Sequence, residues 1–209
     1  MSFSFMSHFP QTAGQCKYLL ALQSPKPIVI GVGPAGCGKT MLACREALSF
    51  VGGTNRGRIV ITRPIVPADD RDLGYLPGDL EKKMLPFTMP MYDVFDSTYS
   101  RSTIDRFLSV EPLGFMRGRT FTNTWLIADE MQNATKEQMK MLLTRVGYGT
   151  KLIITGDPDQ SDLGPENGLA DLLDRIEGLD LEHIDVVHME NDDILRHPSV
   201  QEVIKIYEV

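Results

Sequence analysis

A glycine-rich segment carries the clearest chemical signal in the chain. Residues 33–40 read GPAGCGKT, which matches the pattern G-x-x-x-x-G-K-[ST] at every fixed position. In this pattern glycines let backbone N–H groups converge on phosphate oxygens, the lysine reaches the β- and γ-phosphates, and the hydroxyl binds Mg²⁺. A chance glycine-rich turn is the alternative, but the apolar segment before the loop and the helical segment after it favour phosphate binding. The residues assigned to this loop are Gly33, Pro34, Ala35, Gly36, Cys37, Gly38, Lys39 and Thr40, with Lys39 also assigned to catalysis.

Two acidic residues, Asp129 and Glu130, follow the apolar segment TWLIA. A carboxylate at the tip of a strand beside a phosphate loop can hold Mg²⁺ through water, and a second one can polarise the attacking water. We therefore assign Asp129 to the metal together with Thr40, and Glu130 to the catalytic base. An acid pair that merely begins a helix is the alternative, and the phosphate loop upstream favours catalysis.

Two further segments carry polar residues that suit a phosphate site. Asp157 and Gln160 lie in ITGDPDQ, directly after another apolar segment, where they can sense a γ-phosphate and orient water; an ordinary Gly-Asp-Pro turn is the alternative. Arg196 stands before His197 and Pro198. A guanidinium there can stabilise transition-state charge, yet an arginine ahead of a proline-started helix can equally be a surface residue. The sequence leaves these two interpretations of Arg196 open.

Alternating strands and helices are required to bring these segments together. Apolar, β-branched segments predict strands at 27–32, 58–62, 124–128 and 151–155, with a weaker one at 181–187. Helical patterns cover 11–23, 39–50, 135–146, 167–176 and 199–207. This alternation predicts an α/β fold in which helices cover both faces of a parallel sheet, as in P-loop nucleoside triphosphatases.

One segment breaks the alternation. Residues 64–118 open with a loop rich in proline and glycine and continue as a helical stretch from residue 79. Such long excursions between core strands are more often functional than decorative. The aromatic side chains there suit stacking on single-stranded bases, although at helical spacing they are more often core residues; they are Tyr75, Phe87, Tyr92 and Phe95. We expect a single domain over residues 1–209 that contains this excursion.

Composition places the chain among ordinary globular proteins. Its 209 residues are 42% hydrophobic and 23% charged, and the formal net charge is −7. The first ten residues lack the pattern of a secretion signal, and no apolar run is long enough to cross a bilayer, so we expect a cytoplasmic location and no membrane partner. A net negative surface does not attract nucleic acid in general, so a polyanion would need a local basic patch.

Five segments of the sequence together resemble the PhoH family of phosphate-starvation-type ATPases, which is related to the cores of superfamily-one helicases. They are GVGPAGCGKT, TRPIVPADDRDLGYLPGDLEKKMLPF, FMRGRTFTNTWLIADEMQNAT, EQMKMLLTRVGYGTKLIITGDPDQSDL and RHPSV. The resemblance implies a RecA-like core, ATP and Mg²⁺ as ligands, ATP hydrolysis, and action on RNA. By motif position Gln15 looks like the glutamine that reads adenine, and Gln160 like that of the G-D-x-x-Q motif.

The resemblance also raises the question of partners. Arg63, Arg117 and Arg119 look like candidates for contact with single-stranded RNA or a neighbouring subunit. Helicases of this class close two cores on ATP, whereas this chain has one. We therefore expect homo-oligomers that assemble head to tail, in a ring if the rotation closes, a hexamer being one such ring. Arg196, Arg117 or Arg119 would then complete a neighbour's site.

Two other functions share the phosphate loop. A small-molecule kinase needs no catalytic glutamate after the metal-binding aspartate, so the Asp129–Glu130 pair and GDPDQ argue against it. A nucleotide-dependent switch or scaffold, which acts through a protein partner without moving along nucleic acid, stays open.

Overall fold

The computed structural model describes residues 10–52, 57–64, 80–195, 199, 200, 202 and 206, with backbone alone for residues 80–87. Six strands in these residues form one sheet in the order β3-β2-β4-β5-β1-β6, and every pairing is parallel. Their bounds are β1 Ile28–Val32, β2 Arg58–Thr62, β3 Leu108–Val110, β4 Thr124–Ala128, β5 Lys151–Gly156 and β6 Ile184–His188. The predicted α/β fold with a parallel sheet is thus confirmed.

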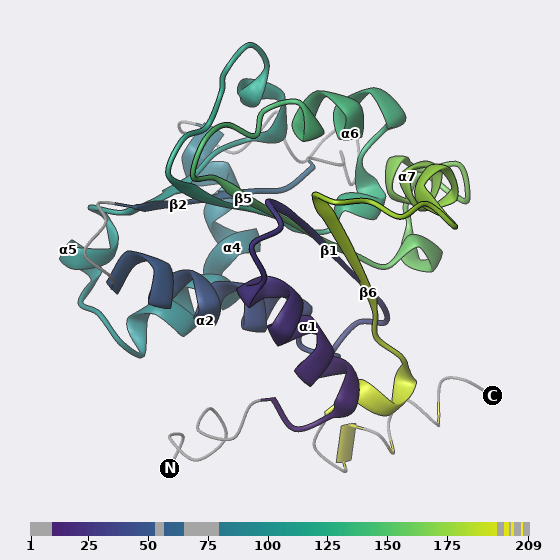
Figure 1. Cartoon of the computed structure of the whole chain (residues 1–209). Helices are drawn as coiled ribbons and strands as arrows, with labels where there is room; N and C mark the ends of the chain where they lie inside the picture. The colour runs from purple at the N-terminus through teal and green to yellow at the C-terminus, as the bar shows by residue number, and fades with distance from the viewer. Residues whose placement is uncertain are drawn as a thin grey trace.

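Helices lie before β1 and in most connections between successive strands, and they cover the two faces of the sheet (Figure 1). Their bounds are α1 Ala13–Gln23, α2 Lys39–Gly52, α4 Leu80–Asp96, α5 Arg101–Ile104, α6 Lys136–Leu143 and α7 Gly168–Ile176. Single 3₁₀ turns lie at η2 Leu113–Met116, η3 Met131–Asn133, η4 Pro158–Gln160 and η5 Asn191–Asp193. In Figure 1, α1 and α2 lie on one side of the sheet and α6 lies on the other. No helix in the described part of the chain is long and apolar enough to span a bilayer.

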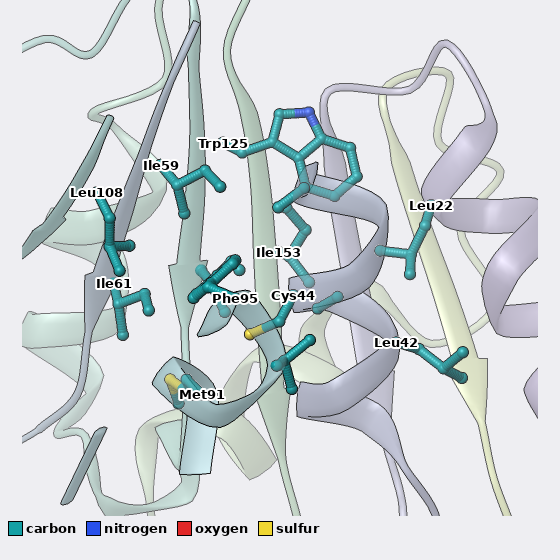
Figure 2. Packing of buried hydrophobic residues seen from close by; sticks show 14 of the residues in the cluster. Leu22, Leu42, Cys44, Ile59, Ile61, Met91, Phe95, Leu108, Trp125 and Ile153 are labelled. Carbon is teal, nitrogen blue, oxygen red and sulfur yellow. The ribbon is translucent and has the colours of Figure 1, made fainter. Parts of the chain in front are cut away.

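Buried side chains alternate between two apolar clusters, one on each face. In β4, Trp125 and Ile127 join the cluster under α1, α2 and α4, while Leu126 and Ala128 join the cluster under α6 and α7. Figure 2 shows the first cluster, where Leu42, Cys44 and Phe95 from the helices gather over the strands. Because both faces are covered, the central strands appear in the sequence as uninterrupted apolar runs rather than as alternating ones.

The excursion between β2 and β4 contains α4, which corresponds to the helical stretch predicted from residue 79, together with elements that the sequence pattern did not predict. These include α5 and the edge strand β3, which pairs with β2 from Ile59↔Leu108 to Ile61↔Val110. β3 has three residues, too few to give a strand signal. Tyr92 and Phe95 are core residues. Tyr75 and the side chain of Phe87 lie outside the part of the chain that the structure describes. Most of the predicted helix 199–207 also lies outside it.

The register aligns the carboxyl ends of four central strands at one edge of the sheet. Val32 pairs with Gly156, Ala128 with Ile154, and Thr62 with Ala128. The residues that leave these strands are therefore neighbours: Gly33 after β1, Asp157 after β5, Asp129 after β4 and Arg63 after β2. Loops at this edge of parallel sheets are the usual place for ligands.

Candidate functional site

The glycine-rich loop takes a backbone shape that needs its glycines. Gly33, Gly36 and Gly38 have φ angles of 149°, 90° and 91°, a region that side chains with a Cβ avoid. At Gly33 a Cβ would also collide with the carbonyl oxygen of Met189. Helix α2 begins at Lys39, so the positive end of its dipole and its free N–H groups face the loop. The loop is therefore built to receive an anion.

The ammonium of Lys39 is held by the loop itself. Its Nζ donates to the carbonyl oxygens of Gly33 at 2.5 Å and Pro34 at 2.9 Å, and lies 3.5 Å from Cys37 Sγ. The residue is buried. The positive charge is thus positioned over the same backbone that would surround a phosphate.

Asp129 is buried at the tip of β4, with 5% of its surface exposed. Its Oδ1 accepts hydrogen bonds from Thr40 Oγ1 at 2.6 Å and Thr155 Oγ1 at 2.5 Å. Burial raises the pKa of the Asp129 carboxyl; the hydrogen bonds from Thr155 and Thr40 lower it, the charge of Glu130 raises it, and the charge of Arg63 lowers it, with a net increase. The two hydroxyl donors and the charge of Arg63 therefore oppose the effect of burial on the pKa of this carboxyl.

The residues assigned to magnesium have suitable chemistry. Thr40 and Asp129 present adjacent oxygen atoms, the ligand type that Mg²⁺ prefers, and Mg²⁺ usually takes one or two protein oxygens and completes its shell with phosphates and water. In the described ranges no cluster of three His, Cys, Asp or Glu residues forms an all-protein metal cage. The arrangement suits a cation that arrives with a phosphate ligand.

Glu130 occupies a strained backbone position and is held by a neighbouring amide. Its φ and ψ are 54° and 41°, in the left-handed region that glutamate seldom adopts. Gln132 Nε2 donates to Glu130 Oε2 at 2.6 Å, and Gln132 Oε1 accepts from the backbone N–H of Asp157 at 3.1 Å. Gln132 therefore orients the carboxylate and joins the ends of β4 and β5. Our sequence reasoning missed this residue, although an amide so close to an acid pair is a usable signal.

A cavity of ≈ 600 Å³ contains most of the predicted site residues. The phosphate loop and α2 form one wall, and the ends of β2, β4 and β5 form the floor. The excursion contributes another wall from α4. The lining residues include Ala35, Gly36, Gly38, Lys39, Thr40, Arg63, Pro90, Met91, Asp93, Val94, Asp129, Glu130, Asp157, Gln160 and Leu195. The structure thus brings together the motifs that the sequence indicated separately, and adds α4 to them.

Gln15 lies behind the phosphate loop and is fully buried. Its Nε2 donates to the carbonyl oxygens of Cys37 at 3.1 Å and Asp193 at 3.3 Å, while its Oε1 accepts from Gln11 N–H at 2.9 Å. Gln15 does not line the cavity. The observed contacts join α1, the phosphate loop and η5, and the assignment of Gln15 to adenine stays a prediction.

Asp193 fixes the segment that leads to Arg196. The carboxylate accepts from Gly14 N–H at 3.1 Å and Glu190 N–H at 2.8 Å, and is buried. Burial raises its pKa, but hydrogen bonds from Thr12 and from these two N–H groups hold the pKa below its ordinary value. Two residues later Leu195 lines the cavity. Arg196 itself lies outside the described residues.

The other arginines singled out in the sequence lie elsewhere. Arg117 is exposed in the loop before β4. Arg119 pairs with Glu111, and its guanidinium lies 4.7 Å from the ring centre of Phe121. Neither residue lines the cavity of its own chain. Arg63, which was grouped with them, does line it.

The six parallel strands, with β5 between β1 and β4 and the glycine-rich loop between β1 and α2, define a P-loop NTPase core. Solved structures share this fold. The large terminase of a thermophilic bacteriophage aligns over 93% of this chain and 49% of its own with a TM-score of 0.63 at 16% identity. A second structure of that terminase, in complex with ADP, aligns over the same shares with a TM-score of 0.58 at 15% identity.

Residues 9–208 match the family model for PhoH-like protein, and the chain belongs to that family. The PhoH-like protein of Bacillus subtilis is 40% identical over 205 residues, 95% of this chain and 63% of the relative. Protein PhoH of Escherichia coli K12 is 39% identical over 202 residues, 92% of this chain and 56% of the relative. The chain therefore spans less than two thirds of the length of these relatives.

The Asp193 contacts predict a pH-dependent loss of stability. Asp193→Asn leaves one acceptor oxygen for two N–H donors, so the free energy of unfolding at about pH 7 should fall by about 1–3 kcal/mol in urea titrations. Because the folded-state pKa is depressed, the wild-type advantage is present above the unfolded-state pKa and is lost as pH falls through the folded-state pKa, so the difference should shrink toward about pH 3.

Asp180→Asn, at an exposed position, is the matched control and should leave stability unchanged at every pH. A loss for Asp193→Asn that is the same across the series would contradict a role for the ionised carboxylate.

Proposed function

We propose that this protein binds ATP with magnesium and hydrolyses the β–γ phosphoanhydride bond. The observation that carries the proposal is the convergence of Lys39, Thr40, Asp129 and Glu130 in one cavity at the carboxyl edge of the sheet. The structural similarity to a terminase that binds ADP supports a nucleotide as the ligand. A nucleoside triphosphatase needs an anion cradle, a site for the metal and a base, and each has a residue here.

In the proposed mechanism the residues that act on the nucleotide are ones that line the cavity. The loop N–H groups bind the phosphates, and Lys39 exchanges its carbonyl contacts for phosphate oxygens. Thr40 and Asp129 would hold Mg²⁺, which would supply positive charge to neutralise the phosphates. Glu130, oriented by Gln132, accepts a proton from the attacking water. Gln160 lies at the same cavity and orients that water.

We further propose that hydrolysis is coupled to single-stranded RNA. The α4 wall makes the inserted excursion a direct neighbour of the nucleotide cavity, so a change of nucleotide can reach it. The loop that contains η2 offers an exposed ring, Phe115, and the exposed Arg117 two residues later. A stacking surface next to a cation is the combination that binds single strands without sequence preference. This loop is a better candidate for base contacts than the buried rings Tyr92 and Phe95.

Assembly into a head-to-tail ring is the third part of the proposal. Arg117 is exposed and does not line the cavity of its own chain. In a head-to-tail contact such an arginine reaches the site of the next subunit, where it can stabilise transition-state charge. Arg119 and Arg196 remain candidates for the same role.

The first test is ATP turnover with and without single-stranded RNA. Glu130→Gln should lower kcat roughly 10²–10⁴-fold, because the amide cannot accept the proton, while equilibrium binding of ATP is retained. Glu137→Gln, the same substitution at an exposed position of α6, is the control and should keep wild-type turnover. RNA should raise the wild-type rate well above its basal level.

Full activity in Glu130→Gln would contradict the assignment of Glu130 as the catalytic base. Turnover that does not change when RNA is added would agree with ATP hydrolysis but would contradict its coupling to RNA. A switch that acts through a protein partner would then be the better hypothesis.

Mixing two inactive variants tests the assembly. If Arg117 acts on the neighbouring site, Glu130→Gln and Arg117→Ala should each be impaired alone, and a mixture should regain part of the turnover, since some interfaces then combine an intact base with an intact arginine. Arg119→Ala is tested in the same way. A monomer by light scattering with full turnover per chain would contradict head-to-tail assembly.

A further inference from the structure

The nucleotide cavity has a marked excess of negative side chains. Four carboxylates line it, those of Asp93, Asp129, Glu130 and Asp157. Among its described lining residues the cations are Lys39 and Arg63. A nucleoside triphosphate brings further negative charge, and in the transition state of phosphoryl transfer that charge is spread over the γ-phosphate oxygens and the leaving oxygen. Lys39 belongs to the phosphate loop, so Arg63 is the cation on the opposite side of the acid pair.

The sheet register places Arg63 beside Asp129. Arg63 follows Thr62, the last residue of β2, and Thr62 pairs with Ala128, the last residue of β4. The carbonyl oxygen of Thr62 accepts the N–H of Asp129 at 2.9 Å. The two side chains thus leave adjacent parallel strands at the same level and face the same cavity.

We propose that Arg63 acts within its own subunit on the γ-phosphate of bound ATP, rather than on RNA; this inference rests on the ATPase function proposed above. As the bond from water oxygen to γ-phosphorus forms and the bond to the β–γ bridging oxygen breaks, the guanidinium stabilises charge on the γ-phosphate oxygens. The water proton passes to Glu130, the electron pair of the broken bond stays with ADP, and inorganic phosphate is the second product.

The burial of Arg63 favours this role over RNA binding. Arg63 is half-buried in the cavity wall, whereas Arg117 is exposed on a loop that a polymer can reach. A strand of RNA that reached Arg63 would have to share a carboxylate-lined cavity with the nucleotide. A single γ-phosphate fits there, and a planar guanidinium can contact two of its oxygens at once.

The test compares Arg63→Ala and Arg63→Lys with wild-type protein, and uses Arg175→Ala as the matched control. Arg175 pairs with Asp171 on the exposed side of α7 and does not line the cavity. Arg63→Ala should lower kcat roughly 10²–10³-fold, and Arg63→Lys should recover part of it. Affinity for ADP should stay within about twofold, while affinity for ADP with aluminium fluoride, a transition-state analogue, should fall by a factor similar to that of kcat.

Retained ADP binding shows that each variant is folded, and two further measurements locate the arginine. Affinity for single-stranded RNA should be unchanged in Arg63→Ala. Mixing Arg63→Ala with Glu130→Gln should restore no turnover, because base and arginine must belong to the same subunit. Recovery on mixing, or loss of RNA affinity with intact affinity for the aluminium fluoride complex, would overturn the inference. Absence of turnover in wild-type protein overturns both proposals, whereas a fully active Arg63→Ala overturns this one alone.

Discussion

A single carboxylate oxygen, Oδ1 of Asp129, accepts hydrogen bonds from two hydroxyls on different elements. Thr40 belongs to the first turn of α2, directly after the phosphate loop, and Thr155 lies on β5. Leaving a buried carboxylate without partners is costly. The end of β4, the start of α2 and the end of β5 must therefore keep these relative positions for Asp129 to be buried with its hydrogen bonds intact. The same contact sets the position of the phosphate loop relative to the acid pair. The remainder of the site is arranged around it.

The strand order explains why this contact forms. β5 lies between β1 and β4, so the loop after β1 and the acids after β4 face each other across the end of β5. Gln132 makes a second connection between the ends of β4 and β5. Its Nε2 donates to the Glu130 carboxylate, and its Oε1 accepts from the N–H of Asp157. Behind the phosphate loop, Gln15 and Asp193 connect α1, the loop and η5 through hydrogen bonds. A site made of short polar contacts is thus held by segments far apart in the sequence.

Much of this could be predicted from the sequence because its signals are local. The phosphate loop, the central strands and the acid pair are each contained in a short run of adjacent residues, and each strand is an apolar run that ends at the same edge of the sheet. The resemblance to the PhoH family also depends on short segments of adjacent residues. The bounds of the predicted strands differ from the observed ones by a few residues at most. In a parallel sheet with helices on both faces, the core strands appear in the sequence as apolar runs, which mark where each strand begins and ends.

The remainder depends on tertiary contacts that no local pattern records. β3 is too short to be seen and is defined by its pairing with β2. The position of α4 in the cavity wall follows from packing of Met91, Tyr92 and Phe95 in the core. By motif position Arg63 was a candidate for contact with RNA or a neighbouring subunit, and only the β2–β4 register shows that it lies beside Asp129. Gln132 was one amide among several until its two partners were known.

The central claim is that the cavity at the carboxyl edge is the place where MgATP reacts. A structure of the protein with ADP, aluminium fluoride and magnesium tests it most directly. We predict that the phosphates lie within the loop formed by residues 33–40, that magnesium lies beside Thr40 and Asp129, and that Glu130 faces the fluoride group. Nucleotide bound elsewhere, or in this loop with Glu130 turned away from the transferred group, would contradict it.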